Sequence, residues 1–141
     1  DVVYEPGELR VVAYRDGAEW ATDAVETAGA AAALALAADR PAIAGDGRDL
    51  SYVTATVVDA EGRRVPDAAN AIRFSVTGPG ELVATDNGNP MDRTVFSSAE
   101  RDAFSGLALA IVRAAPAQSG AITVTATASG LTQAEAVITA P

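Results

Sequence analysis

The sequence predicts an all-β protein built as an antiparallel sandwich, and two observations support this. Apolar residues alternate with polar residues or alanine over short runs, as in residues 72–77 and 122–127. Alternation with a period of two places one face of a strand on a core and the other in solvent. Turn signals separate the runs at short intervals, at Asp16-Gly17, Gly45-Asp46-Gly47, Glu61-Gly62, Gly78-Pro79-Gly80, Asn87-Gly88, Ser119-Gly120 and Ser129-Gly130. Short strands separated by such turns are typical of a sandwich.

The first predicted element is a β-hairpin. Residues 8–14 and 19–27 have the pattern of strands, and Arg15-Asp16-Gly17 supplies the turn between them. Two strands alone are marginally stable in water. We therefore expect residues 1–29 to be the last strands of a preceding domain. Alternatively, the hairpin lies across the following domain or pairs with another chain through its open edge.

Residues 30–40, AAAALALAADR, combine the highest helix propensity of the chain with a stop at Pro41. Leu34 and Leu36 are two residues apart, which places them on opposite sides of a helix but on the same face of a strand. We predict a linker that runs into a strand, with a helix as the alternative.

Residues 30–141 contain about seven further strand candidates, enough to form a sandwich by themselves. Residues 107–111 belong to this set, because Leu107, Leu109 and Ile111 alternate with alanine. We therefore predict two parts, residues 1–29 and residues 30–141.

Composition excludes several classes of function. The chain of 141 residues carries 10 basic and 19 acidic side chains, a net charge of −9, and all ten basic residues are arginine. Nucleic-acid binding and binding to an anionic membrane both need clustered positive charge, so we expect neither. Cysteine, histidine and lysine are absent. No thiolate nucleophile, catalytic triad, Schiff base, disulfide or zinc site of imidazole and sulfur is therefore available, and we expect no cofactor.

Carboxylates remain as candidate catalytic groups, but their surroundings argue against that role. Catalysis by a pair of carboxyl groups needs two of them close together, one of them with a raised pKa. No glutamate lies in an apolar run that would raise its pKa by burial. We expect all eight to be solvated and assign no catalytic residue; they are Glu5, Glu8, Glu19, Glu26, Glu61, Glu81, Glu100 and Glu135.

Residues 85–105 form the longest stretch without clean alternation, and long loops on rigid scaffolds often carry function. Asp86, Asn87, Asn89 and Asp92 offer oxygen atoms to a calcium ion. Their spacing is not that of an EF-hand, and Asn-Gly with Asn-Pro is ordinary turn chemistry. We therefore favour turn structure over a metal site.

Two further sets of residues allow alternative interpretations. Arginines can pair with carboxylates between domains or can lie on a solvated face, and the candidates are Arg73, Arg93, Arg101 and Arg113. Arg63 and Arg64 are expected to face solvent. Tyr4, Tyr14 and Trp20 provide a sugar-stacking platform or, as we favour, packing contacts, with Tyr14 and Trp20 as a cross-strand pair.

Three segments together resemble one family. They are YEPGELRVVAYRDGAEWATDAVETAG (residues 4–29), LSYVTATVVDAEGRRVPDAANAIRFSVTGPGELVATDNGNP (50–90) and ERDAFSGLALAIVRA (100–114). The first resembles the end of an immunoglobulin-like domain of glycoside hydrolase family 2, in its bacterial β-galactosidase-like members. The others resemble the additional C-terminal β-sandwich of that family, which is similar to invasin-type modules. The order and spacing of the segments make the resemblance specific.

The resemblance implies an immunoglobulin-like sandwich at residues 30–141 that belongs to a hydrolase of O-glycosidic bonds. The catalytic glutamates of the family lie on a (β/α)₈ barrel, and nothing here matches such a motif. The resemblance also places Asn89 where the family usually has aspartate, in Asn-Gly-Asp-Pro. We expect Asp86, Asn87, Asn89, Asp92 and Arg101 to form a loop that packs against a neighbouring domain or borders the substrate cleft.

The expected partners are the other domains of the hydrolase, together with a second chain at the hairpin edge. The resemblance is compatible with export to the periplasm or the cell exterior. No residue of the sequence indicates the location of the protein. The alternatives are a bacterial immunoglobulin-like adhesion module and a carbohydrate-binding module.

Overall fold

The computed structural model describes residues 3 and 5–141, and within that part all ten regular elements are strands. They are β1 Glu8–Arg15, β2 Ala18–Glu26, β3 Ala33–Ala38, β4 Leu50–Val58, β5 Ala71–Thr77, β6 Gly80–Asp86, β7 Glu100–Asp102, β8 Leu107–Ala114, β9 Gly120–Ala128 and β10 Ala134–Ala140. The all-β prediction is confirmed. Over the same residues there is no helix that could cross a membrane.

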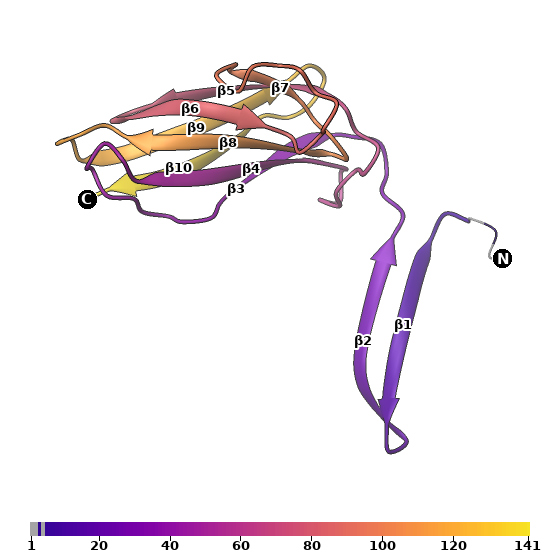
Figure 1. Ribbon diagram of the computed structural model, residues 1–141. Helices are drawn as coiled ribbons and strands as arrows, with labels where there is room; N and C mark the ends of the chain where they lie inside the picture. Colours follow the sequence, from indigo (N-terminus) through magenta and orange to yellow (C-terminus); the bar gives the residue numbers. More distant parts are fainter. Residues whose placement is uncertain (1–2, 4) are drawn as a thin grey trace.

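Two four-stranded antiparallel sheets form the sandwich (Figure 1). One has the order β3-β4-β8-β6 and the other the order β10-β9-β5-β7. The first sheet corresponds to strands A, B, E and D of an immunoglobulin sandwich, and β5, β9 and β10 correspond to C, F and G. The short strand β7 has no counterpart among these seven strands. It lies between strands D and E in the sequence and pairs with β5.

The core consists mainly of small aliphatic side chains, with Phe74 as its only fully buried aromatic residue among those described. On β8 the buried residues are alanine and valine, whereas Leu107, Leu109 and Ile111 lie half-buried on the outer face. The period of two is therefore confirmed for this strand, but the larger residues do not face the core. Alternation specifies two faces, and the pairing of Ala108 with Ala55 on β4 decides which face is inside.

Strand β3 confirms the prediction for residues 30–40 and closes one side of the sandwich. Leu34 is buried and Leu36 is half-buried on the same face. Besides its pairing with β4, the amide of Leu34 donates to the carbonyl of Thr132, and the amide of Ile43 donates to Thr139 on β10. This segment thus contacts both sheets along one edge.

The loop of residues 87–99 closes the opposite side, where β6 and β7 are the edge strands. The amide of Thr85 on β6 donates to Phe96 at 2.7 Å, and the amide of Phe74 on β5 donates to Ala99 at 2.8 Å. The expectation of one continuous loop over residues 85–105 is wrong at both ends. Strand β6 extends to Asp86, and β7 interrupts the loop by pairing with β5.

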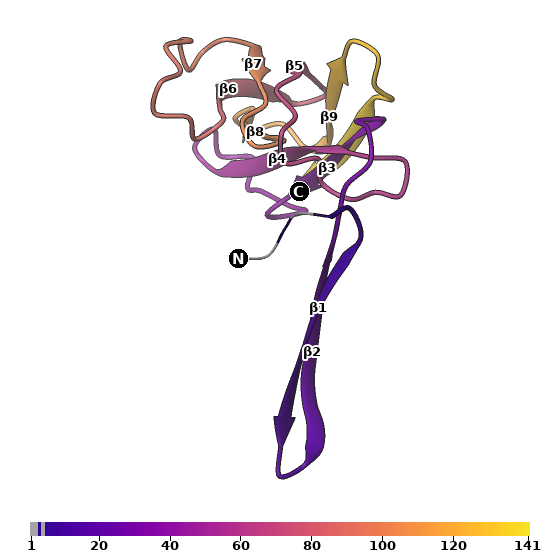
Figure 2. The same ribbon diagram turned by 90° about the vertical axis from the view of Figure 1, so that its right-hand side faces the viewer.

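Strands β1 and β2 form a separate hairpin that extends away from the sandwich (Figures 1 and 2). Asp16 (φ 52°) and Gly17 (φ 80°) both have positive φ, as a two-residue type I′ turn requires. A bulge in β2 aligns Tyr14 with Glu19 and leaves Trp20 without an opposite residue. The predicted cross-strand pair of Tyr14 and Trp20 is therefore wrong.

One face of the hairpin is apolar and uncovered. Leu9 pairs with Val25, and Val11 follows on the same face opposite Asp23. The exposed fractions of Leu9, Val11 and Val25 are 75%, 65% and 67%. Large apolar side chains that align on one face of a two-stranded sheet are typical of a surface that packs against further structure.

Candidate functional site

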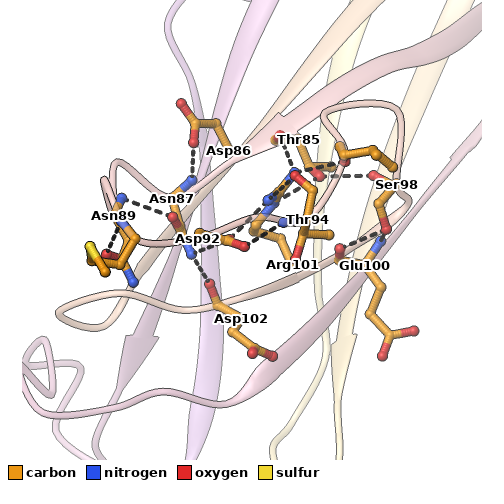
Figure 3. Close-up of polar contacts among 12 residues, drawn as sticks. Thr85, Asp86, Asn87, Asn89, Asp92, Thr94, Ser98, Glu100, Arg101 and Asp102 are labelled. Carbon is orange, nitrogen blue, oxygen red and sulfur yellow. Dashed lines mark hydrogen bonds and ion pairs between the residues drawn. The ribbon is translucent and has the colours of Figure 1, made fainter.

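Arg101 on β7 binds the loop of residues 87–99, which connects the two edge strands β6 and β7 (Figure 3). Its side chain is 2% exposed, and all five of its N–H groups have acceptors. Nε and Nη2 donate to Oγ1 and the carbonyl of Thr85, at 3.2 and 2.7 Å. The other acceptors are the carbonyls of Thr94 and Val95, both at 3.0 Å, and the Asp92 carboxylate at 2.9 Å. Arg101 therefore holds the loop from inside.

The carboxylate of Asp92 is the anionic partner of this guanidinium. Its Oδ1 accepts a hydrogen bond from the amide of Thr94 at 2.8 Å, and its Oδ2 accepts one from Asn87 Nδ2 at 3.0 Å. The hydrogen bond from the Thr94 amide, followed by that from Arg101, lowers the pKa of Asp92 well below its usual range. Asp92 therefore remains charged at neutral pH.

The remaining polar residues of the loop form turns. Oδ1 of Asp86 accepts from the amides of Asn87 and Gly88, and Oδ1 of Asn89 accepts from the amide of Met91 at 3.0 Å. These contacts are side-chain-to-backbone turns of the kind that asparagine and aspartate favour. The oxygen atoms considered for calcium are thus engaged by backbone N–H groups. The described residues contain no group of three acidic residues arranged to hold a metal ion.

The structure brings together three of the five predicted site residues. The side chains of Asn87, Asp92 and Arg101 bond to one another, whereas the side chains of Asp86 and Asn89 accept hydrogen bonds only from backbone amides in turns of the same loop. Arg101 was expected either on a solvated face or in a pair between domains, and both expectations are wrong. The one signal in the sequence is that Arg101 stands between two acidic residues, Glu100 and Asp102, which are exposed on β7.

A hollow of about 460 Å³ lies beside the loop, which we call the loop hollow. Its lining combines two exposed apolar side chains, Met91 and Phe104, with polar residues from both sides of the loop. The residues are Ala69, Asn87, Asn89, Met91, Asp92, Arg93, Asp102, Ala103 and Phe104.

A second polar cluster joins the hairpin to the sandwich. The carboxylate of Asp59, 2% exposed, accepts a 2.8 Å hydrogen bond from the amide of Gly29 and another from the amide of Arg63. The bond from Gly29 is the main reason why the pKa of Asp59 is lowered. The Arg63 guanidinium forms ion pairs with Glu26 on β2 and with Glu61. We call these contacts the junction cluster.

The junction cluster corrects the expectation that Arg63 faces solvent. Its side chain is 38% exposed and pairs with Glu26, which is 37 residues away in the sequence. The other candidates for pairs between domains form contacts within the sandwich, Arg73 with Glu100 at 3.6 Å and Arg113 with Glu81 at 2.6 Å. Among the described residues, Arg93 has no hydrogen-bonded or ionic partner.

The glutamates and the aromatic residues of the hairpin lie at the surface. All eight glutamates are exposed, and Asp59 is the one buried acid among the described residues. Tyr14 and Trp20 are 68% and 69% exposed near the tip of the hairpin. Tyr4, the third member of the proposed sugar platform, lies outside the described residues.

Comparison with known proteins connects both parts of the chain to one group of enzymes. The family described as "Glycoside hydrolase family 2 C-terminal domain 5" matches residues 34–137, and a domain of unknown function, DUF4982, matches residues 1–21. Over 139 residues the chain is 38% identical to the β-galactosidase BoGH2A of Bacteroides ovatus. The matched region covers 99% of this chain and 16% of that enzyme.

Solved structures show the same relationship. A family 2 glycosyl hydrolase from Bacteroides cellulosilyticus superposes with a TM-score of 0.93 at 37% identity, over 99% of this chain and 18% of that one. A β-glucuronidase from glycoside hydrolase family 2 superposes with a TM-score of 0.88 at 26% identity, over 100% of this chain and 15% of that one. The chain therefore spans less than a fifth of the length of these relatives.

Proposed function

The chain belongs to the glycoside hydrolase family 2 C-terminal domain 5 family, and from this premise we propose that it is a non-catalytic region of a β-galactosidase-like glycoside hydrolase. Its role is to pack against other domains of the enzyme and to shape access to the substrate. The proposal draws on the name of the Bacteroides ovatus relative, a β-galactosidase, and on the exposure of every glutamate in the chain.

The observation that carries the packing role is the uncovered apolar face of the hairpin. In this proposal residues 1–29 are the last strands of a preceding immunoglobulin-like domain, and that domain covers Leu9, Val11 and Val25. The match of DUF4982 to residues 1–21 supports a separate domain identity for the hairpin. Residues 30–141 then form the sandwich that follows, and the junction cluster holds the two parts together.

The loop of residues 87–99 is the proposed contribution to the substrate cleft or to a neighbouring domain. Its backbone is held by Arg101 and Asp92, whereas Met91 is 76% exposed and Phe96 is 64% exposed. Exposed apolar side chains on a rigid loop are typical of a recognition surface.

The test of the packing role compares one substitution in two contexts. Leu9→Asp lowers the melting temperature of the full-length enzyme, because burial of a leucine contributes about 1.5–3 kcal/mol that the aspartate loses. In the isolated 141-residue chain the same change has little effect, because the side chain is already exposed. Val137→Asp on β10, where the valine is 57% exposed, is the matched control. An unchanged melting temperature of the full-length Leu9→Asp enzyme overturns the packing role.

The loop role has its own test in the full-length enzyme. Met91→Asp leaves the Arg101 contacts intact, because only the backbone of Met91 takes part in the turn. We expect a changed KM or a changed ratio of kcat/KM for a β-galactoside and a β-glucuronide if the loop borders the cleft. We expect a lower melting temperature if the loop packs against a domain. The absence of all these effects contradicts the role of the loop.

A further inference from the structure

We propose that the loop hollow is a binding site for a saccharide unit, with preference for a neutral pyranoside. This inference rests on the proposed function, since it assumes a protein that meets carbohydrates. It goes beyond that function by assigning a ligand to a surface of the C-terminal sandwich itself. The volume of about 460 Å³ falls within the range of about 300–1,000 Å³ that small-molecule sites occupy.

The apolar part of the hollow suits the non-polar face of a sugar ring. Phe104 is 43% exposed and Met91 is 76% exposed, and both line the hollow. The face of an aromatic ring carries negative charge density and attracts the slightly positive C–H groups on one side of a pyranose. Exposure of Phe104 at this concave place, rather than on a convex surface, allows contact on more than one side of a ligand.

Three polar side chains of the lining have hydrogen-bonding groups to spare. Within the part of the chain that the structure describes, the guanidinium of Arg93 and the carboxylate of Asp102, both in the lining, form no hydrogen bond or ion pair. The side-chain nitrogen Nδ2 of Asn89 likewise has no hydrogen-bond partner among the described residues, while its Oδ1 accepts from the amide of Met91. Together these groups offer donors and acceptors to hydroxyl groups, which both donate and accept hydrogen bonds.

The wall of the hollow is held in place before any ligand arrives. Asn87 Nδ2 donates to the carbonyl of Asp102 at 2.9 Å and to Asp92, which pairs with buried Arg101 behind the wall (Figure 3). Asp102 belongs to β7, so one side of the hollow lies on a strand rather than on a free loop. A preorganised site loses less conformational entropy on binding.

Charge favours a neutral sugar over a uronic acid. The chain has a net charge of −9, and Asp92 and Asp102 both line the hollow. Arg93 is the one basic side chain of the lining, and the described acids outnumber it there. Arg101 compensates the charge of Asp92, so the repulsion of a ligand carboxylate arises from the net charge of the whole chain and is strongest at low ionic strength.

The experiment is a titration of the ¹⁵N-labelled 141-residue chain, followed by amide chemical shifts. Methyl β-D-galactopyranoside and methyl β-D-glucuronide are added separately up to about 50 mM, a range that reports dissociation constants near 1 mM or weaker. We expect saturable shift changes for Asn89, Arg93, Asp102 and Phe104 with the galactoside, and weaker binding of the glucuronide. No shift change, or changes located outside the hollow, overturns the proposal. Tighter binding of the glucuronide overturns the preference for a neutral sugar.

Two variants distinguish specific binding in the loop hollow from nonspecific binding to exposed aromatic residues. Phe104→Ala weakens binding by about tenfold through loss of the stacking contact. Tyr52→Ala is the matched control, because Tyr52 is an aromatic residue of the same sandwich with 42% exposure that does not line the hollow. Equal weakening by both variants overturns the proposal.

Arg93→Ala keeps the test decisive if Phe104→Ala does not fold, because the Arg93 side chain has no described contact to lose. We expect Arg93→Ala to weaken galactoside binding severalfold with an unchanged melting temperature, and unchanged affinity in this variant contradicts the assignment. Leu9 lies on the hairpin, outside the hollow. Failure of the titration is therefore distinguishable from failure of the Leu9→Asp test of the packing role.

Discussion

Arg101 on β7 donates a 2.7 Å hydrogen bond to the main-chain oxygen of Thr85 on β6, and thereby links the edge strands of the two sheets. Immunoglobulin-like sandwiches often connect their sheets by a disulfide. This chain has no cysteine. Here a buried guanidinium supplies the connection through two hydrogen bonds to Thr85, and its other three hydrogen bonds hold the intervening loop. Asp92 compensates its charge.

We predict that Arg101→Ala destabilises the chain by about 3–5 kcal/mol, the usual effect of removing one partner of a buried ion pair. The substitution leaves the Asp92 carboxylate without its counter-ion and removes one hydrogen-bond donor from each of three main-chain oxygens, those of Thr85, Thr94 and Val95. The measurement is urea-induced unfolding with linear extrapolation to water.

The control for this substitution is Arg113→Ala. Arg113 also pairs with a carboxylate, Glu81, but its side chain is 40% exposed. An exposed pair contributes less than about 1 kcal/mol. Similar losses for Arg101→Ala and Arg113→Ala would contradict the structural importance of the buried pair.

The Asp92 carboxyl predicts a dependence of stability on pH. Its pKa in the folded chain is lowered, chiefly by the Thr94 amide and then by Arg101, from an unfolded value of about 3.9. The folded state therefore binds fewer protons than the unfolded state in acid. The stabilisation by Asp92 is complete above the unfolded pKa and is lost as the pH falls through the folded pKa.

Comparison with Asp92→Asn isolates this contribution from those of other carboxyls. We expect the difference in free energy of unfolding between the original chain and Asp92→Asn to be largest above about pH 5. The difference should narrow steadily as the pH falls below about 4. Urea unfolding at a series of pH values measures it, and a difference that stays constant down to pH 2 would show that ionisation of Asp92 is irrelevant.

The junction cluster predicts that Arg63 restricts the orientation of the hairpin. Arg63→Ala removes the ion pair with Glu26 but leaves the hydrogen bond from Gly29 to Asp59. We therefore expect a broader range of hairpin orientations, with only a small change in melting temperature because the pair is partly exposed.

Energy transfer measures that range directly. Trp20 is the only tryptophan, and the absence of cysteine allows a single acceptor label at Ser129→Cys, in the exposed turn between β9 and β10. Time-resolved transfer from Trp20 should give a wider distance distribution in Arg63→Ala than in the control Arg64→Ala. Identical distributions in the two variants would exclude an orienting role of Arg63.

Local sequence patterns predicted the strands well, because burial on one face repeats every second residue within a single element. Residues 30–40 illustrate this, since the spacing of Leu34 and Leu36 outweighed the helix propensity of the alanines. On β8 the same pattern left the inner face undetermined, because the inner face depends on pairing with β4. The bulge at Trp20 shifts the pairing of β1 with β2, so Tyr14 lies opposite Glu19. A prediction that assumes two strands without a bulge misses this shift.

The polar network was only partly predictable. The sequence located Asn87, Asp92 and Arg101 in one loop, yet burial of Arg101 depends on carbonyls contributed by residues up to 16 positions away. The pairing of Glu26 with Arg63 spans 37 positions and has no local signal. Contacts between distant polar residues cannot be predicted until the fold is known, whereas the strands could be predicted from the apolar pattern.

The bond from the Gly29 amide to Asp59 has a practical consequence for protein engineering. A truncated or chimeric protein that starts at residue 30 retains the Asp59 carboxylate but removes one of its donors, the Gly29 amide. It also removes Glu26, one of the two glutamates that pair with Arg63. A graft of this sandwich onto a foreign enzyme should therefore include strands β1 and β2 together with the sandwich.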